Sequence, residues 1–179
     1  MKNKIIIITG WNCTGKSTFA QKLSERINIP FFNADVINEI VGDGLGNEGW
    51  EIYKNGNNVT FSLLMHITEK FLQSGKICII ENNFIQPEVE KIKLMLEKYN
   101  CDCLTYMFNG DLDVLGDRYF NRERHWVHSK ARDAGVMRRY PEARKLMNVE
   151  IGQMIYIDTT SYESVDYESL FIAAENYIV

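Results

Sequence analysis

The chain has 179 residues, a length that favours one domain with a sizeable core over two domains. Its composition, 45% hydrophobic and 25% charged with three prolines, argues against a disordered or fibrous chain. No apolar run is long enough to cross a bilayer, and the amino end lacks a signal-peptide pattern, so we expect a cytoplasmic protein without a membrane partner. The four cysteines lack a metal-binding or disulfide-framework spacing, which favours reduced thiols.

The first predicted strand, residues 5–9, is followed directly by a complete phosphate-loop motif. Residues 10–17 fit the pattern G-x-x-x-x-G-K-[ST], and a helix is predicted over residues 16–28. The two glycines allow successive backbone N–H groups to turn inward around an anion, and the helix adds its unpaired N–H groups. We expect Lys16 on the terminal phosphates of a nucleotide and the Ser17 hydroxyl on Mg²⁺. The expected nucleotide contacts are Gly10, Asn12, Cys13, Thr14, Gly15, Lys16, Ser17 and Thr18.

Strands and helices are predicted to alternate along the rest of the chain. The further strands are expected at residues 31–33, 76–81, 103–108 and 154–158. The further helices are expected at residues 35–41, 59–73, 87–99, 111–124, 141–149 and 166–177, with a loop rich in Gly and Asn at residues 42–58. Because this alternation is typical of a parallel sheet, the predicted fold class is α/β, a three-layer α/β/α P-loop NTPase fold with a five-stranded parallel sheet.

Polar residues follow several of the predicted strands, whose carboxyl ends meet at one edge of a parallel sheet. Asp35 is a candidate base for the proton of a hydroxyl acceptor, although an Asp in this place could also cap a helix. Glu81 is a candidate for holding Mg²⁺ through water, or for pairing with Lys16 or an arginine. Thr160 is a candidate contact for the adenine of ATP.

A basic segment follows the fourth predicted strand. Residues 118–145 hold nine Arg and Lys side chains against three acidic ones, in a chain of net charge −4. Arg118, Arg122 and Arg124 are candidates for stabilising a transferred phosphate when a lid of about residues 118–135 closes over the site. A solvated basic helix is the alternative, and a channel for a polynucleotide end is a further one.

Two pairs of side chains are ambiguous in the sequence. Trp50 and Tyr53 lie in a predicted acceptor-side insert at about residues 35–58, where they either stack on the acceptor or pack the loop. His125 and His128 are three residues apart, but no acid or cysteine completes a metal site, so we expect phosphate contacts or surface residues.

Together these features resemble a known group, the small P-loop kinases of the AAA-type ATPase and kinase family. This group includes chloramphenicol phosphotransferase, zeta toxins, polynucleotide kinases and gluconate kinase. The resemblance covers most of the chain and rests on residues 10–17, Asp35, residues 79–84, the arginines from 118 to 124, and residues 158–160. It implies that MgATP is bound and that an Asp in the place of Asp35 serves as the base. The sequence departs from shikimate kinases, because Asn33 stands at the first position of their Asp-x-Asp motif.

The predicted protein is thus one kinase domain over residues 1–179, a monomer or homodimer that uses ATP and Mg²⁺. Its predicted reaction transfers the γ-phosphate to a hydroxyl of a small molecule, a nucleoside or a polynucleotide end. Two alternatives stay open: an NTP-hydrolysing switch and a non-catalytic, nucleotide-binding regulatory protein. The switch is disfavoured because the sequence has no guanine-reading Asn-Lys-x-Asp segment.

Overall fold

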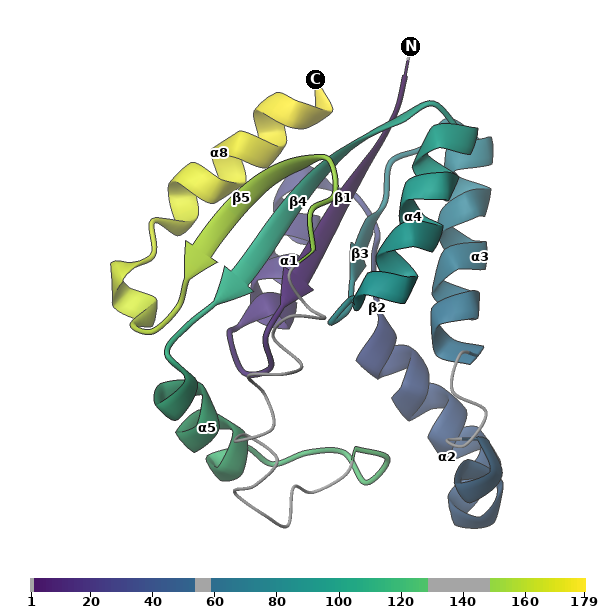
Figure 1. Cartoon of the computed structure of the whole chain (residues 1–179), viewed down its shortest axis with the longest axis vertical. Coiled ribbons are helices and arrows are strands. Elements are labelled where there is room, and N and C mark those ends of the chain that lie inside the picture. The colour runs from purple at the N-terminus through teal and green to yellow at the C-terminus, as the bar shows by residue number, and fades with distance from the viewer. Residues whose placement is uncertain (1, 54–58, 129–148) are drawn as a thin grey trace.

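A five-stranded parallel sheet forms the centre of the computed structural model, which describes residues 2–53, 59–128 and 149–179 (Figure 1). The strand order is β2-β3-β1-β4-β5. The strands are β1 (Asn3–Gly10), β2 (Phe31–Asn33), β3 (Ile79–Glu81), β4 (Cys101–Asn109) and β5 (Gln153–Asp158). The predicted fold class is therefore confirmed, with β1 in the middle of the sheet.

Helices cover both faces of this sheet (Figure 1). On one face lie α1 (Lys16–Ile27) and α8 (Tyr167–Ile178), and on the other lie α3 (Val59–Gln73) and α4 (Gln86–Lys98). The isoleucines of β1 alternate between the two cores: Ile6 and Ile8 pack with α1 and α8, while Ile5 and Ile7 pack with α3 and α4. All four are fully buried, as expected for a strand with helices on both sides.

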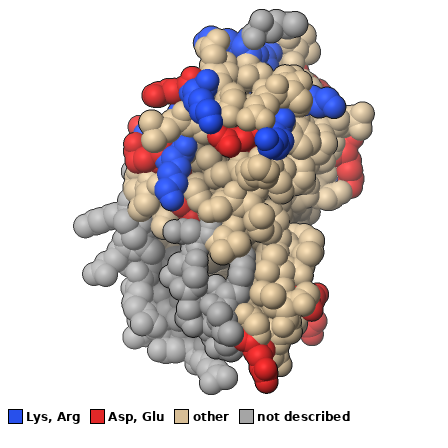
Figure 2. Space-filling view, turned by 90° about the vertical axis from the view of Figure 1, so that its right-hand side faces the viewer, with Lys and Arg blue, Asp and Glu red and all other residues tan. Residues whose placement is uncertain are grey.

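Two helices leave the carboxyl end of the sheet and flank the loops there (Figure 1). They are α2 (Ala34–Tyr53) and α5 (Leu112–Asn121), and a short 3₁₀ turn, η2 (Tyr162–Ser164), follows β5. In the part of the chain that the structure describes, no helix combines the length and the apolar character needed to cross a membrane. On the face seen in Figure 2, basic side chains lie in the upper half among acidic ones, and the described charged side chains of the lower part are acidic only.

The helix α2 is the main difference from the predicted elements. The sequence predicted one or two helical turns followed by a loop, whereas α2 continues to Tyr53 with a kink at Gly46, where φ is 66°. Gly42 allows this continuation to pack, because a Cβ atom there would collide with the side chain of Val127. Tertiary packing thus outweighs the low helix propensity of glycine in this segment.

Several predicted boundaries also move. The third strand is shorter than predicted and begins at Ile79, whose N–H group donates to the carbonyl of Pro30. The helix α5 ends at Asn121 instead of residue 124, because Arg122 has an extended backbone (φ −88°, ψ 130°). The helix predicted over 141–149 and the far part of the predicted lid, from residue 129 on, fall outside the described residues, except that residue 149 is not helical.

All four cysteines are free thiols, as predicted. Cys78 and Cys103 are buried in the core, and burial raises the pKa of each to about 12. These two side chains are therefore protonated at neutral pH and unreactive.

Candidate active site

The phosphate loop connects β1 to α1 through a backbone that needs glycine. Gly10 has a φ of 126° and Gly15 a φ of 83°, both in the region that L side chains rarely adopt. A Cβ atom at Gly10 would also collide with the backbone of Phe108 on the neighbouring strand β4. Cys13, between the two glycines, has a φ of 60°, and the Tyr162 hydroxyl donates to its carbonyl oxygen (2.8 Å).

Lys16 begins α1 and points back under the loop. Its side chain is buried, with 6% of the residue exposed, and Nζ donates to the carbonyl oxygen of Trp11. Burial lowers the pKa of Lys16, while the carboxylates of Glu81 and Asp35 act in the opposite direction. A cation that is shielded from water interacts strongly with a nearby anion, which suits a contact to phosphate.

Oxygen ligands for a magnesium ion gather beside Lys16. The Asn33 amide donates to the Ser17 hydroxyl (3.3 Å) and to the Glu81 carboxylate, and so joins the ends of β2 and β3 to the start of α1. Glu81 is buried, and burial raises its pKa, with Lys16 opposing this shift. Hydroxyl and carboxylate oxygens are the ligand types that Mg²⁺ prefers, so this donor set fits the predicted metal.

The described residues do not form a metal site built from protein ligands alone. Among residues 2–53, 59–128 and 149–179, no group of three or more His, Cys, Asp or Glu side chains could hold an ion. Magnesium in phosphate-transferring sites takes only one or two protein oxygens and completes its shell with water and phosphate. The pair Ser17 and Glu81, as predicted from the sequence, would supply such oxygens.

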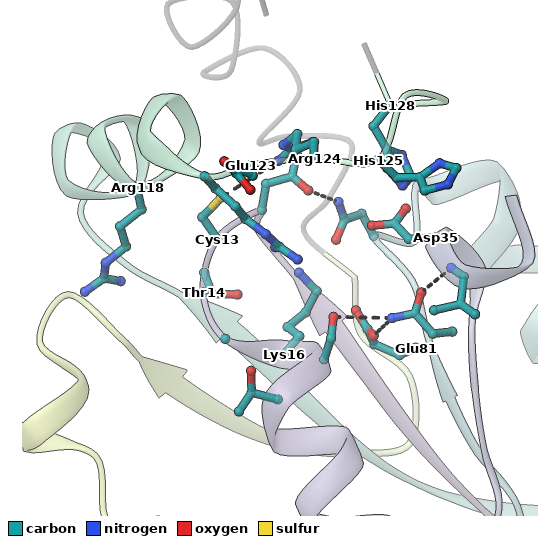
Figure 3. A pocket seen from close by; sticks show the side chains of 18 of the residues that line it. Cys13, Thr14, Lys16, Asp35, Glu81, Arg118, Glu123, Arg124, His125 and His128 are labelled. Atoms are coloured by element: carbon teal, nitrogen blue, oxygen red, sulfur yellow. Dashed lines mark hydrogen bonds between the residues drawn. The ribbon is translucent and has the colours of Figure 1, made fainter. Parts of the chain in front are cut away.

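A cavity of about 640 Å³ opens in front of the loop (Figure 3). It is lined by polar and charged side chains from both halves of the sheet. The lining consists of Asn12, Cys13, Thr14, Gly15, Lys16, Ser17, Thr18, Asn33, Asp35, Val36, Glu39, Glu81, Asn83, Arg118, Arg122, Glu123, Arg124, His125, His128 and Tyr162. Of the residues predicted to contact the nucleotide, hold the metal or act in catalysis, all except Gly10 and Thr160 are in this lining.

The β2 side of the cavity carries two acidic side chains of α2. Asp35 lies in the first turn of α2, and Glu39 follows one turn later on the same side of the helix. The helix is capped by Asn33, whose Oδ1 accepts from the N–H group of Val36 (3.0 Å). Asp35 is therefore not needed as the cap, and it contributes to the cavity wall instead.

The segment after α5 contacts α2 across the mouth of the cavity. The Nε2 atom of His128 lies 2.9 Å from Glu39 Oε1, and that of His125 lies 3.3 Å from Asp43 Oδ1. Next to them, the Trp126 indole N–H also donates to Asp43 (2.8 Å). Both histidines were expected as phosphate contacts or surface residues, and the structure pairs them with carboxylates of α2.

The three predicted arginines take different positions. Arg118 donates to the carbonyl oxygens of Thr159 (2.7 Å) and Thr160 (3.0 Å), and it lies on the opposite side of Lys16 from Asp35 (Figure 3). Its guanidinium stacks on the ring of Tyr162 at 3.9 Å. This position is beside the loop that follows β5.

Arg124 and Arg122 lie closer to the phosphate loop. The guanidinium of Arg124 lies 3.8 Å from the centre of the Tyr119 ring, and its Nη2 is 3.8 Å from the sulfur of Cys13. Arg122 lines the cavity, and its positive charge contributes to lowering the pKa of Lys16. A role of these arginines at the transferred phosphate remains a prediction.

Thr160 and Trp50 have structural partners. The Thr160 hydroxyl donates to Asp158 (2.6 Å) and accepts from the N–H group of Asp111 (2.8 Å), so it fastens the loop after β5. Trp50 is 9% exposed and meets Trp126 edge to face, with ring centres 6.1 Å apart. Trp50 therefore packs the insert, which was one of its two predicted roles. The side chain of Tyr53 is outside the described part of the chain.

Sequence reasoning missed several residues of the cavity, among them Glu39 and Tyr162. Glu39 carried a usable signal, because a residue four positions after Asp35 shares its helix face. Tyr162 follows the fifth strand by four residues, yet nothing local shows that its hydroxyl reaches Cys13, which is 149 positions away.

A phosphate loop that leads from the central strand of a parallel sheet into a helix defines the class of P-loop NTPases. Within that class, the chain belongs to the AAA domain family, which matches residues 5–145. Among curated proteins, the chain is similar to a shikimate kinase of Brucella canis, with 26% identity over 143 residues, or 79% of this chain and 68% of that protein.

Solved structures show the same fold over nearly the whole chain. A protein of Chloroflexus aurantiacus described as a candidate kinase has a TM-score of 0.74 at 21% identity, covering 99% of this chain and 96% of that one. A gluconokinase of Sinorhizobium meliloti has a TM-score of 0.61 at 17% identity, covering 98% and 95%. The fold is thus that of the small P-loop kinases, as the resemblance in the sequence implied.

Proposed function

We propose that this protein is an ATP-dependent kinase that transfers the γ-phosphate of MgATP to a hydroxyl group of a small molecule. The observation that carries the proposal is one cavity lined by the phosphate loop, by Lys16 and by the carboxylate of Asp35. A nucleotide-binding loop alone would suit a switch protein as well. A carboxylate that shares the cavity with the loop gives the site a place for a hydroxyl acceptor.

In this mechanism, the loop and Lys16 hold the triphosphate, and Ser17 and Glu81 hold the metal directly or through water. Bound MgATP supplies the phosphoryl group and a metal that neutralises part of its charge. Asp35 orients the acceptor hydroxyl and accepts its proton as the new bond to the γ-phosphorus forms, while the bond from that phosphorus to the bridging oxygen breaks and ADP leaves. The segment that carries Arg122 and Arg124 brings positive charge to the same place and excludes water.

The test compares Asp35→Asn with the wild type. We expect kcat to fall by about 10²–10⁴-fold, the usual contribution of a general base, while the Kd for MgATP changes little. Asp102→Asn is the matched control, because Asp102 is exposed at the opposite end of β4, where it pairs with Lys2. Transfer of radiolabelled phosphate to a panel of hydroxyl compounds gives kcat, and calorimetry gives Kd.

Other outcomes would favour the alternative functions. ATP hydrolysis that a second protein accelerates, without any phosphorylated acceptor, would indicate a switch. Binding of MgATP without hydrolysis or transfer would indicate a regulatory nucleotide-binding protein. Wild-type transfer activity in Asp35→Asn would contradict the assigned role of this carboxylate.

A further inference from the structure

We infer that the acceptor side of the cavity is built for a polyhydroxylated amine and disfavours carboxylate acceptors. The acceptor side is defined here by Asn33, Asp35, Val36, Glu39, Asn83 and His128, which line the cavity from β2, α2, the end of β3 and the segment after α5. This inference rests on the proposed kinase function, because it concerns the molecule that receives the phosphate.

The cationic side chains of the cavity lie outside the acceptor side. The described ones in the lining are Lys16, which begins α1, and the three arginines between positions 118 and 124. Two acids, Glu81 and Glu123, also line the cavity outside the acceptor side. On the acceptor side as defined, the structure shows no Lys or Arg, and Asp35 and Glu39 stand one helical turn apart on α2. A carboxylate on the acceptor would meet like charge there, and an ammonium group would meet opposite charge.

The neutral groups of the acceptor side suit hydroxyls. The Asn83 amide donates to the side-chain oxygen of Asn12 (2.6 Å), which orients it at the cavity wall. Across the cavity, His128 contacts Glu39 at 2.9 Å and fixes that carboxylate in place. Amides and imidazoles can donate and accept hydrogen bonds, and carboxylates accept them, so together they can satisfy a polyol. Val36 supplies an apolar surface beside them.

A matched series of ligands tests the charge preference directly. Glucamine, glucitol and gluconate share one six-carbon polyol chain and carry an ammonium group, no charge and a carboxylate, respectively. Titration of the full chain with each compound, in the presence of MgADP, gives three dissociation constants. We expect glucamine to bind about tenfold more tightly than gluconate, the size of one charge-assisted hydrogen bond, with glucitol between them.

The variant Glu39→Gln shows whether this side chain causes the preference. The substitution keeps the shape and removes the charge, so the advantage of glucamine over glucitol should disappear. Glu48→Gln is the control, because Glu48 is an exposed acid on the same helix outside the cavity lining, and it should leave the preference unchanged. Thermal unfolding checks that both variants are folded.

Three results would overturn the inference: gluconate binding as tightly as glucamine, a preference that survives Glu39→Gln, or no binding of any of the three compounds. These results are separate from a failure of the proposed function. Preferred transfer of phosphate from MgATP to a hydroxyl compound that carries a carboxylate would support the kinase function and contradict the preference for an amine. A chain that binds no MgATP would contradict the kinase itself.

Discussion

Gly10 holds the phosphate loop in a backbone conformation that no other residue adopts without strain. Its φ of 126° is unfavourable for any side chain, and a Cβ atom would strike the backbone of Phe108. We therefore expect Gly10→Ala to lower the free energy of unfolding by at least about 2 kcal/mol, from strain and overpacking together, and to weaken MgATP binding. Urea unfolding and calorimetry measure the two effects.

The control for this prediction is Gly44→Ala. Gly44 is an exposed glycine of α2, and a Cβ atom added to it would have no neighbour within 4 Å, so its replacement should be neutral or slightly stabilising. If the two variants lost the same amount of stability, the collision with Phe108 would not destabilise the Gly10 variant, and the prediction would be wrong.

Residues of the site could be predicted from the sequence where they belong to a contiguous motif or lie at the end of a strand. The phosphate loop is a contiguous motif, and all of its predicted contacts except Gly10 line the cavity. Asp35 was found because it follows a strand and Glu81 because it ends one, and these strand ends must meet at one edge. The partners of Cys13, which are Tyr162 and Arg124, depend on long-range packing and leave no pattern in the sequence.

The position of the helix α1 depends on one aromatic cluster. Phe19 is 2% exposed and stacks on Phe171 of α8 at 5.2 Å, while Tyr106 and Phe108 of β4 lie 5.1 and 5.3 Å away. Since α1 begins at the phosphate loop, this cluster fixes the loop to the sheet and to the last helix.

We expect Phe19→Ala to lower the free energy of unfolding by about 3–5 kcal/mol, the usual result of removing a buried aromatic ring. The affinity for MgATP should fall as well, because the start of α1 loses its support. Phe120→Ala is the control, since Phe120 of α5 is 46% exposed, and its loss should stay within about 0.5 kcal/mol. Urea denaturation would contradict the prediction if the two variants were equally stable.

At the level of elements, apolar runs predicted every described strand, and helical periodicity predicted the amphipathic helices, because each of these helices buries one face. It failed at α2, where four glycines in the first sixteen residues of the helix indicated a loop. The helix persists because Trp50 and Val127 pack against Gly42. It also failed at the end of α5, where the chain leaves the helix and contacts α2 through His125 and His128.

Two buried ionisable side chains of the cavity, Lys16 and Glu81, affect the stability of the whole molecule. Lys16 and Glu81 are 6% and 5% exposed, and burial disfavours the charged form of each. We expect the double variant Lys16→Met, Glu81→Gln to be about 1–4 kcal/mol more stable than the wild type, as when buried charges are replaced by neutral side chains. Each single variant should be less stable than the double one, because it leaves one charge unpaired.

The pH dependence of stability gives a second measurement on the same proteins. Because burial raises the pKa of Glu81 above its ordinary 4.5, the folded chain binds this proton more tightly than the unfolded chain. The contribution to stability is complete below that ordinary value and is lost as the pH rises through the raised pKa. The double variant should lack this loss, and identical pH profiles for the two proteins would contradict the assignment.

The central place of β1 in the strand order has a consequence for the evolution of such a protein. To one side of it, β2 and β3 bring Asn33, Asp35 and Glu81 to the cavity, and to the other, β4 and β5 lead to Arg118 and Tyr162. The two flanks meet at the strand between them and where the segment after α5 contacts α2 through His125 and His128. Under the proposed function, acceptor specificity can therefore change through substitutions on the flank of β2 and β3 while the phosphate loop between β1 and α1 is retained.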